Sequence, residues 1–142
     1  MIFMKHSSRL LAVFAAVLLG LASHVQAQVV AGAPTTIDYQ GKALDATGSP
    51  LANTTPTNYE MRFRIYDAQE GGTVIWSEKQ IVTVSKGLFS VRLGEGTVLS
   101  PAEGSIAQTA LADAFASKER FLGVTIVITG QTPAEILPRL AF

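Results

Sequence analysis

The segment Tyr59–Tyr66 alternates strictly between apolar and polar side chains, and this pattern limits the fold more than any other feature of the sequence. Two sets of residues alternate along it: Tyr59, Met61, Phe63 and Ile65 are apolar, and Glu60, Arg62 and Arg64 are charged. Successive side chains of a strand point to opposite faces of a sheet. The segment is therefore predicted to form a half-buried antiparallel strand with its apolar face on a core.

Further segments with strand character follow at roughly ten-residue intervals, and residues that favour turns separate them. The predicted strands are Ile37–Lys42, Tyr59–Tyr66, Val74–Val84, Leu88–Leu93 and Phe121–Thr129, with a bulge near Glu78–Lys79 and a tight hairpin turn at Ser85–Gly87. Pro138 restricts the residues after it to an edge strand or an extended tail, because proline cannot donate to a ladder.

One short helix is also predicted. Its apolar residues are spaced like one face of an amphipathic helix of about two or three turns; they are Ile106, Ala110, Leu111, Ala114 and Phe115. Taken together, these patterns predict an all-β fold, an antiparallel β-sandwich with one short helix.

The first 27 residues have the features of a secretory signal peptide. Lys5 and Arg9 supply a positive start, and the apolar run Leu10–Leu21 is too short to span a bilayer. Val25 and Ala27 provide the small residues of a cleavage site, so cleavage is expected after Ala27. The predicted organisation is a signal peptide over 1–27, an extended leader over 28–36 and a β-sandwich domain over 37–142, exported to the cell surface, the extracellular space or the periplasm.

The composition excludes several kinds of chemistry. The sequence has no Cys, and its two histidines, His6 and His24, lie in the predicted signal peptide. The mature chain therefore has no means to form a disulfide, a thiolate or imidazole metal site, or a Ser-His-Asp triad. A paired-carboxylate hydrolase remains open through Glu60, Glu78 and Glu95, although such catalysis also needs a cleft. We expect no catalytic residues, no metal site and no cofactor.

The charge pattern also limits the partners. Eleven Lys and Arg balance eleven Asp and Glu, and loss of Lys5 and Arg9 with the signal leaves an acidic excess of two. The basic residues are scattered among acidic ones, so no nucleic-acid surface is expected. No segment after the signal offers the roughly 20 apolar residues of a membrane helix, so no membrane span is predicted in the mature chain.

Five side chains are candidates for a ligand or partner surface: Tyr66, Arg62, Arg64, Arg92 and Trp76. Trp76 could stack on a sugar ring, but its alternation with Val74 favours a core position. Tyr66 shares the outward phase of Arg62 and Arg64 and is the better surface candidate. The arginines could form a basic stripe for an acidic glycan or a phosphate, whereas outward charges more often only solubilise a sheet face.

The motifs also follow a recognisable order, which is Ile37–Lys42, Asp45–Leu51, Met61–Asp67, Gly71-Gly72, Ile75–Glu78, Val82–Val84, Gly87–Gly94, Phe121–Val124 and Leu137–Leu140. This ordered set resembles a bacterial family of exported β-domains found at the start of tail-fibre-like surface proteins. The resemblance covers Ile37–Phe142. It implies a folded N-terminal module with a role in surface structure or adhesion, and it carries over no catalytic residues.

The sequence thus leads to a first functional hypothesis, a non-catalytic exported structural or adhesive module of a bacterial surface or fibre-like protein. Its partner would be a protein, through self-association or a fibre partner, or a surface glycan. The alternative is a carbohydrate-binding module that uses Tyr66, Trp76 and the arginine face. A small carboxylate-dependent hydrolase is the third possibility.

Overall fold

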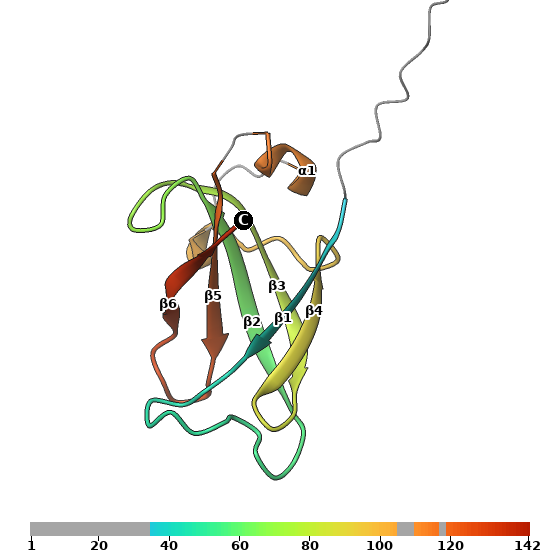
Figure 1. Ribbon diagram of the computed structural model, residues 1–142, viewed down its shortest axis with the longest axis vertical. Coiled ribbons are helices and arrows are strands. Elements are labelled where there is room, and N and C mark those ends of the chain that lie inside the picture. The colour runs from blue at the N-terminus through green and yellow to red at the C-terminus, as the bar shows by residue number, and fades with distance from the viewer. Residues whose placement is uncertain (1–34, 105–109, 117–118) are drawn as a thin grey trace, which may run out of the picture. The chain divides into compact units, whose positions relative to one another are not determined.

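Strand β2, Thr57–Tyr66, contains the alternating segment and lies inside a four-stranded antiparallel sheet (Figure 1). Its neighbours are β3, Val74–Val84, on one side and β5, Phe121–Val127, on the other, and β6, Ala134–Ala141, pairs with β5. This computed structural model describes residues 35–104, 110–116 and 119–142. The predicted signal peptide with its cleavage after Ala27, residues 28–34 of the leader and Ile106 of the predicted helix lie outside the described residues.

The second sheet has two strands, β1, Ile37–Lys42, and β4, Leu88–Leu93, which pair antiparallel. Both strands begin and end where the sequence predicts. The predicted turn between β3 and β4 is confirmed, because Ser85 and Leu88 exchange backbone hydrogen bonds and the two residues between them have positive φ, 51° at Lys86 and 79° at Gly87. Such a turn matches the right-handed twist of the strands that it joins.

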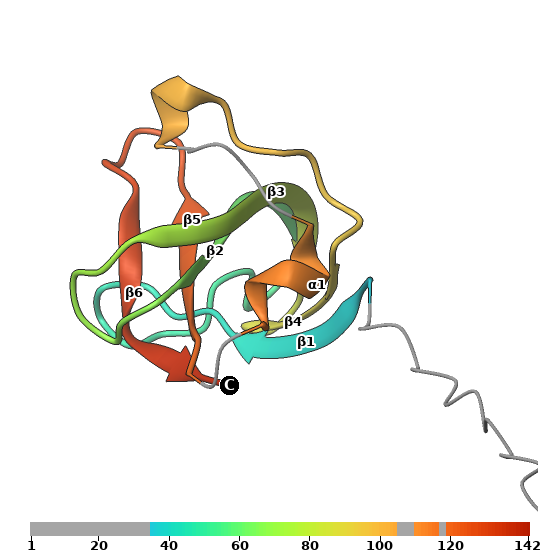
Figure 2. The same ribbon diagram turned by 90° about the horizontal axis from the view of Figure 1, so that it is seen from above.

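Residues of both sheets contribute to one core, and Figure 2 shows how the two sheets are arranged. Met61, Phe63 and Ile65 are fully buried on the inner face of β2. The ring of Tyr39, from β1, packs edge-on against Phe63, with 6.3 Å between ring centroids, and lies 5.8 Å from the ring of Phe89, from β4. The prediction of an antiparallel all-β fold with a short helix is therefore confirmed.

The helix and the last strand differ in extent from the predictions. Helix α1, Leu111–Ala114, is a single turn that buries Leu111 and Ala114, and a 3-10 turn at Pro101–Glu103 was not expected. Pro138 lies in the edge strand β6, as its chemistry requires. Within the described residues, no helix is long and apolar enough to cross a membrane.

The predicted bulge near Glu78–Lys79 is wrong. Strands β2 and β3 stay in register there, and the shift lies nearer the start of β3, where Ile65 pairs with Trp76 but Tyr66 pairs with Val74. The reason is that Glu78 faces the core, 2% exposed, on the same side as Trp76. A buried carboxylate interrupts the apolar pattern without interrupting the ladder.

The hairpin turn supplies a test. Gly87 and Gly48 both have positive φ, 79° and 84°, but a Cβ at Gly87 would lie 2.9 Å from Pro50 Cβ, whereas one at Gly48 would meet nothing within 4 Å. We expect Gly48→Ala to lower the free energy of unfolding by about 1 kcal/mol, the cost of a left-handed residue, and Gly87→Ala to lower it by about 2 kcal/mol or more. Chemical denaturation measures both, and equal losses would contradict this packing.

Candidate functional site

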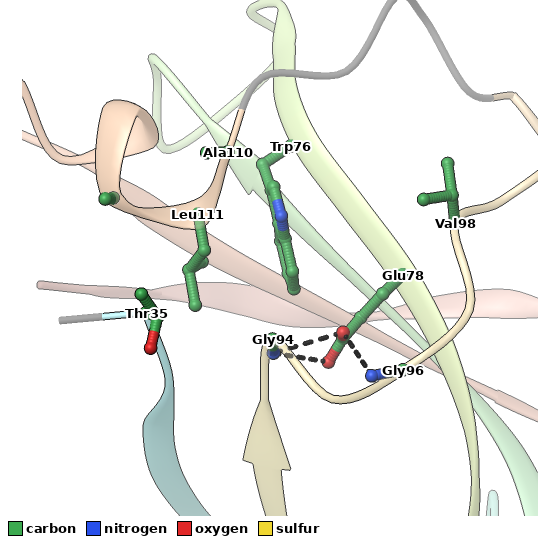
Figure 3. Close-up of a pocket in the computed structure, with 9 residues that line it drawn as sticks. Thr35, Trp76, Glu78, Gly94, Gly96, Val98, Ala110 and Leu111 are labelled. Carbon is green, nitrogen blue, oxygen red and sulfur yellow. Dashed lines mark hydrogen bonds between the residues drawn. The ribbon is translucent and has the colours of Figure 1, made fainter.

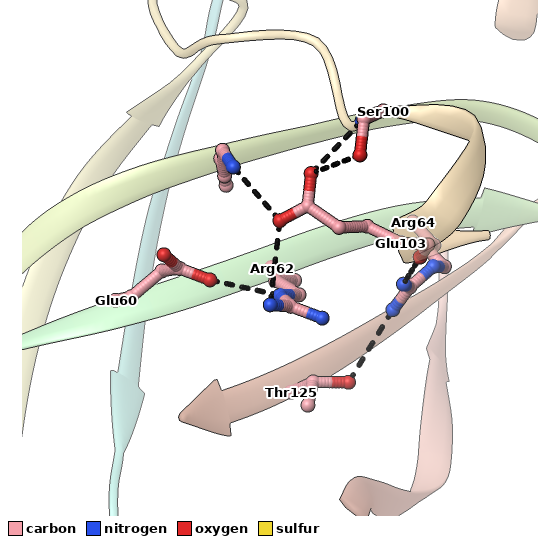
Figure 4. Close-up of polar contacts among 7 residues, drawn as sticks. Glu60, Arg62, Arg64, Ser100, Glu103 and Thr125 are labelled. Atoms are coloured by element: carbon pink, nitrogen blue, oxygen red, sulfur yellow. Dashed lines mark hydrogen bonds and ion pairs between the residues drawn. The ribbon is translucent and has the colours of Figure 1, made fainter. Parts of the chain in front are cut away.

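Arg62 and Arg64 lie on the outer face of β2, as predicted, but the chain segment after β4 covers them (Figure 4). Arg64 Nη2 donates a hydrogen bond to the carbonyl of Glu103 at 2.6 Å, and Arg62 Nη2 lies 3.3 Å from Glu103 Oε1. Arg62 Nε also donates to Glu60 Oε1 at 2.9 Å. Both arginines therefore bind other parts of the chain.

Glu103 holds this segment in place. Its carboxylate accepts hydrogen bonds from Lys79 Nζ at 2.8 Å and from the amide and hydroxyl of Ser100 at 2.9 Å and 2.8 Å. These contacts, that of Lys79 foremost, lower the pKa of Glu103 from its usual 4.5 to about 2. The carboxylate thus pairs with Arg62 and Lys79 beneath the segment, and within the described residues Arg62 and Arg64 form no free basic stripe on this face of β2.

Arg92 lies on a different sheet from the other two arginines. It belongs to β4, where its Nε donates to Asp38 Oδ1 at 3.0 Å and its Nη1 to Glu95 Oε1 at 3.3 Å. The predicted stripe of Arg62, Arg64 and Arg92 is therefore wrong, since the first two lie in the larger sheet and the third in the smaller one.

Tyr66 is buried, 8% exposed, so its predicted role as an exposed aromatic is wrong. It has the outward phase expected of it, but the guanidinium of Arg139 lies over its ring, with Cζ 3.3 Å from the ring centroid. Arg139 comes from β6, which the sequence did not place beside the outer face of β2. Burial is the main reason that the pKa of Tyr66 is raised.

Arg139 connects three parts of the chain. Its Nε and Nη2 donate to the two carboxylate oxygens of Glu135 at 2.8 Å and 3.1 Å. Its Nη1 donates to the carbonyls of Ala68 at 3.0 Å and Gly71 at 2.6 Å, in the turn between β2 and β3. The arginine is therefore bound to β6 itself, to that turn and to the Tyr66 ring.

Gly123 makes room for this arrangement. A Cβ there would overlap the Glu135 carboxylate and lie 2.8 Å from Tyr66 Cε2. The sequence pattern indicated no role for Gly123, Glu135 or Arg139. A glycine inside a strong strand, Phe121–Val127, was the one available signal, because it marks a close approach by another group.

Trp76 lies in the core, 3% exposed, as its alternation favoured. It lines a cavity of about 230 Å³ together with Leu111, Val98 and Glu78 (Figure 3). The cavity lies beside the end of β4, where Gly94 and Gly96 form part of its wall. The indole lines the wall of this pocket but is itself buried, so it offers no open stacking surface.

The Glu78 carboxylate fastens the chain at this cavity. It accepts the amide of Gly94 at 3.2 Å and 3.1 Å, the amide of Gly96 at 2.8 Å and the side-chain amide of Gln80 at 2.8 Å (Figure 3). A Cβ at Gly96 would lie 2.7 Å from Glu78 Oε2, so the approach requires glycine there. Glu78 therefore has a structural role, because its carboxylate holds the backbone at Gly94 and Gly96 in place.

The three carboxylates considered for hydrolysis are not gathered in one place. Glu60 and Glu95 line a separate hollow of about 320 Å³, and each is paired with an arginine. Glu78 lines the other cavity. Over residues 35–104, 110–116 and 119–142, no three acidic, histidine or cysteine side chains are placed to hold a metal ion.

We expect Arg139→Lys to lower the free energy of unfolding by about 2 to 3 kcal/mol, because lysine keeps the charge but loses the paired hydrogen bonds of a largely buried group. Arg92→Lys, at an exposed pair, is the matched control and should change stability little. Denaturation with urea measures both variants. A similar loss at the two positions would contradict the role given to Arg139.

The contact of Glu103 predicts a dependence on acid. Because its pKa is lower in the folded chain than 4.5, its contribution to stability is complete above about pH 4.5 and is lost as the pH falls towards about 2. The stability difference between the native chain and Glu103→Gln should therefore shrink over this range, as followed by denaturation at several pH values. Glu70→Gln, at an exposed glutamate, is the control, and a difference that stays constant with pH would count against the contact.

Comparison with known protein families gives one match. A family model described as a domain of unknown function, DUF8740, matches residues 38–139, from β1 to Arg139 in β6. Neither a curated protein nor a solved structure matches the chain. Because the family model matches well over half of the sequence, the chain belongs to the DUF8740 family.

Proposed function

We propose that this chain is an exported, non-catalytic β-sandwich that serves as a structural or adhesive module of a bacterial surface or fibre-like protein. The proposal rests on two properties of the surface: its charged side chains are paired with one another, and some of its strand edges are open. The charged side chains on the outer face of the larger sheet bind one another, as Arg62 binds Glu103 and Arg139 binds Glu135. Among the outer edges of the two sheets, those of β1 and β6 have no strand partner within the described residues and are not covered by an isolated bridge such as that of Lys79 with Thr97 on β3.

The β6 edge is also apolar. Four large hydrophobic side chains on it or next to it are exposed, namely Ile136, Leu137, Leu140 and Phe142. Exposed strand edges and apolar patches are the surfaces through which β-proteins associate with other chains. They favour a partner that is a protein.

The sandwich and the export are parts of the same proposal. The contact of Tyr39 with Phe63, across the two sheets, supports a sandwich. The predicted signal over residues 1–27 and the resemblance to exported domains of tail-fibre-like proteins support a location outside the cytoplasm.

The other two functions have less support. A carbohydrate-binding module needs an accessible aromatic ring, but Trp76 and Tyr66 are both buried. A carboxylate hydrolase needs two acidic groups that are available at one cleft. Glu60 and Glu95 do line one hollow, but each is paired with an arginine, and Glu78 is bound to backbone amides beside the other pocket.

Fractionation of bacteria that produce the full chain tests the proposal. The expected result is a protein outside the cytoplasm whose N-terminal sequence begins at Gln28, and which chemical cross-linking captures in complexes with protein. Leu18→Arg, which places a charge in the apolar run of the signal, is the control and should keep the chain inside at full length.

Two results would overturn the proposal. A full-length native chain that stays in the cytoplasm would remove the exported role. Binding to a glycan array that Arg92→Ala abolishes, with the fold intact, would favour the carbohydrate-binding alternative.

A further inference from the structure

Strand β1 has one free edge. It pairs with β4 on one side, and within the described residues no backbone hydrogen bond is made on its other side. The hydrogen bond made just after the end of β1 shows which of its backbone amides and carbonyls point towards β4 and which point away. Ala43 donates its amide to Gly87 across the β1–β4 ladder, so the groups of Gly41 and Tyr39 also face β4, because the pattern repeats every second residue.

The groups on the open edge therefore belong to Asp38, Gln40 and Lys42. The neighbouring strand agrees with this assignment, since Leu88 bonds to Ser85 and so Phe89, the next residue, faces β1. The side chains of the same three residues are exposed. The open edge thus offers three sets of backbone donors and acceptors, none of them from a proline.

We infer that β1 pairs antiparallel with β1 of a second copy of this chain, about a two-fold axis at Gln40. This inference names the partner in the assembly role proposed above and rests on it. In this register, Asp38 of each copy lies directly opposite Lys42 of the other. Opposite charges at directly facing positions of neighbouring strands attract, and an isologous contact forms the pair twice.

The charges select this register over the adjacent ones. Moving the axis by one residue, to Tyr39 or Gly41, would place Asp38 or Lys42 opposite Gln40 and lose both charge pairs, and moving it by two would place Asp38 or Lys42 opposite the same residue of the other copy. Asp38 already accepts a hydrogen bond from Arg92, but 75% of its side chain stays exposed, and Lys42 has no ion pair within the described part of the chain. On the inner face, Tyr39 would lie opposite Gly41 of the other copy, where a ring can cover a glycine.

The other edges are less suitable for pairing with a second copy. On the open side of β4, the carbonyl of Arg92 already accepts a hydrogen bond from Gln80 Nε2 at 2.7 Å. The outer edge of β3 is covered, because Lys79 and Thr97 exchange backbone hydrogen bonds of 2.8 Å and 2.9 Å. The β6 edge contains Pro138, and its charged residues, Glu135 and Arg139, already bind each other.

Sedimentation equilibrium on the exported chain tests the inference over a range of concentrations. The native chain should dimerise. Lys42→Asp should weaken the dimer by about tenfold, because the new aspartate of each copy would lie opposite Asp38 of the other and the contact would contain two repulsive pairs. The double variant Asp38→Lys, Lys42→Asp restores opposite charges and should restore the dimer. Lys86→Asp makes the same charge change in the hairpin turn and should leave association unchanged.

Amide hydrogen exchange gives a second measurement. The amides of Asp38, Gln40 and Lys42 should exchange more slowly at concentrations where the dimer forms. A native chain that is monomeric at every concentration, or a dimer weakened equally by Lys42→Asp and Lys86→Asp, overturns the inference. If Lys42→Asp leaves the dimer unchanged but Leu137→Asp abolishes it, the contact lies at β6 and not at β1. An exported monomer would overturn only this pairing, whereas a chain kept in the cytoplasm would overturn the proposed function.

Discussion

The outer face of the larger sheet depends on one partly buried ionic contact, that of Arg139 with Glu135. A guanidinium removed from water must have its charge paired and its hydrogen bonds made, or it becomes strongly destabilising. Arg139 meets this demand with a carboxylate, two carbonyls of the β2–β3 turn and the face of Tyr66. The edge strand, the turn and the end of β2 are therefore fixed to one another by a single side chain, and Gly123 provides the space that its partner needs.

Side-chain alternation was enough to predict most of the strands. The limits of β1 and β4 agree with the sequence pattern because every second residue faces one common core. The pattern failed at Glu78, since alternation of apolar residues cannot show that a buried carboxylate will find backbone amides. The helix was overestimated for a related reason. Spacing showed which residues, such as Leu111 and Ala114, would be buried, but it did not show where the helix would begin.

The candidate surface was harder to predict than the strands. An arginine on the outer face of a strand has the same sequence pattern whether water or another segment covers it. Arg64 is covered by a residue 39 positions away, and Arg139 reaches a carbonyl 71 positions away. Such pairs depend on which strands become neighbours, and one sequence contains no direct record of that. Arg62, Arg64 and Tyr66 were therefore assigned to the correct face but given the wrong surroundings.

The turn at Lys86–Gly87 joins strands of different sheets, because β3 belongs to the larger sheet and β4 to the smaller one. The two layers of the core are thus connected by the shortest kind of loop, and bringing them together costs little chain entropy. During folding, Val82 and Val84 can contact Phe89 and Val91 early, because these residues are close in the sequence. Strands β1 and β5 pair with strands that are far from them in the sequence. Packing of the two sheets can therefore begin between β3 and β4, which are neighbours in the sequence. The long-range strand pairs then extend this core.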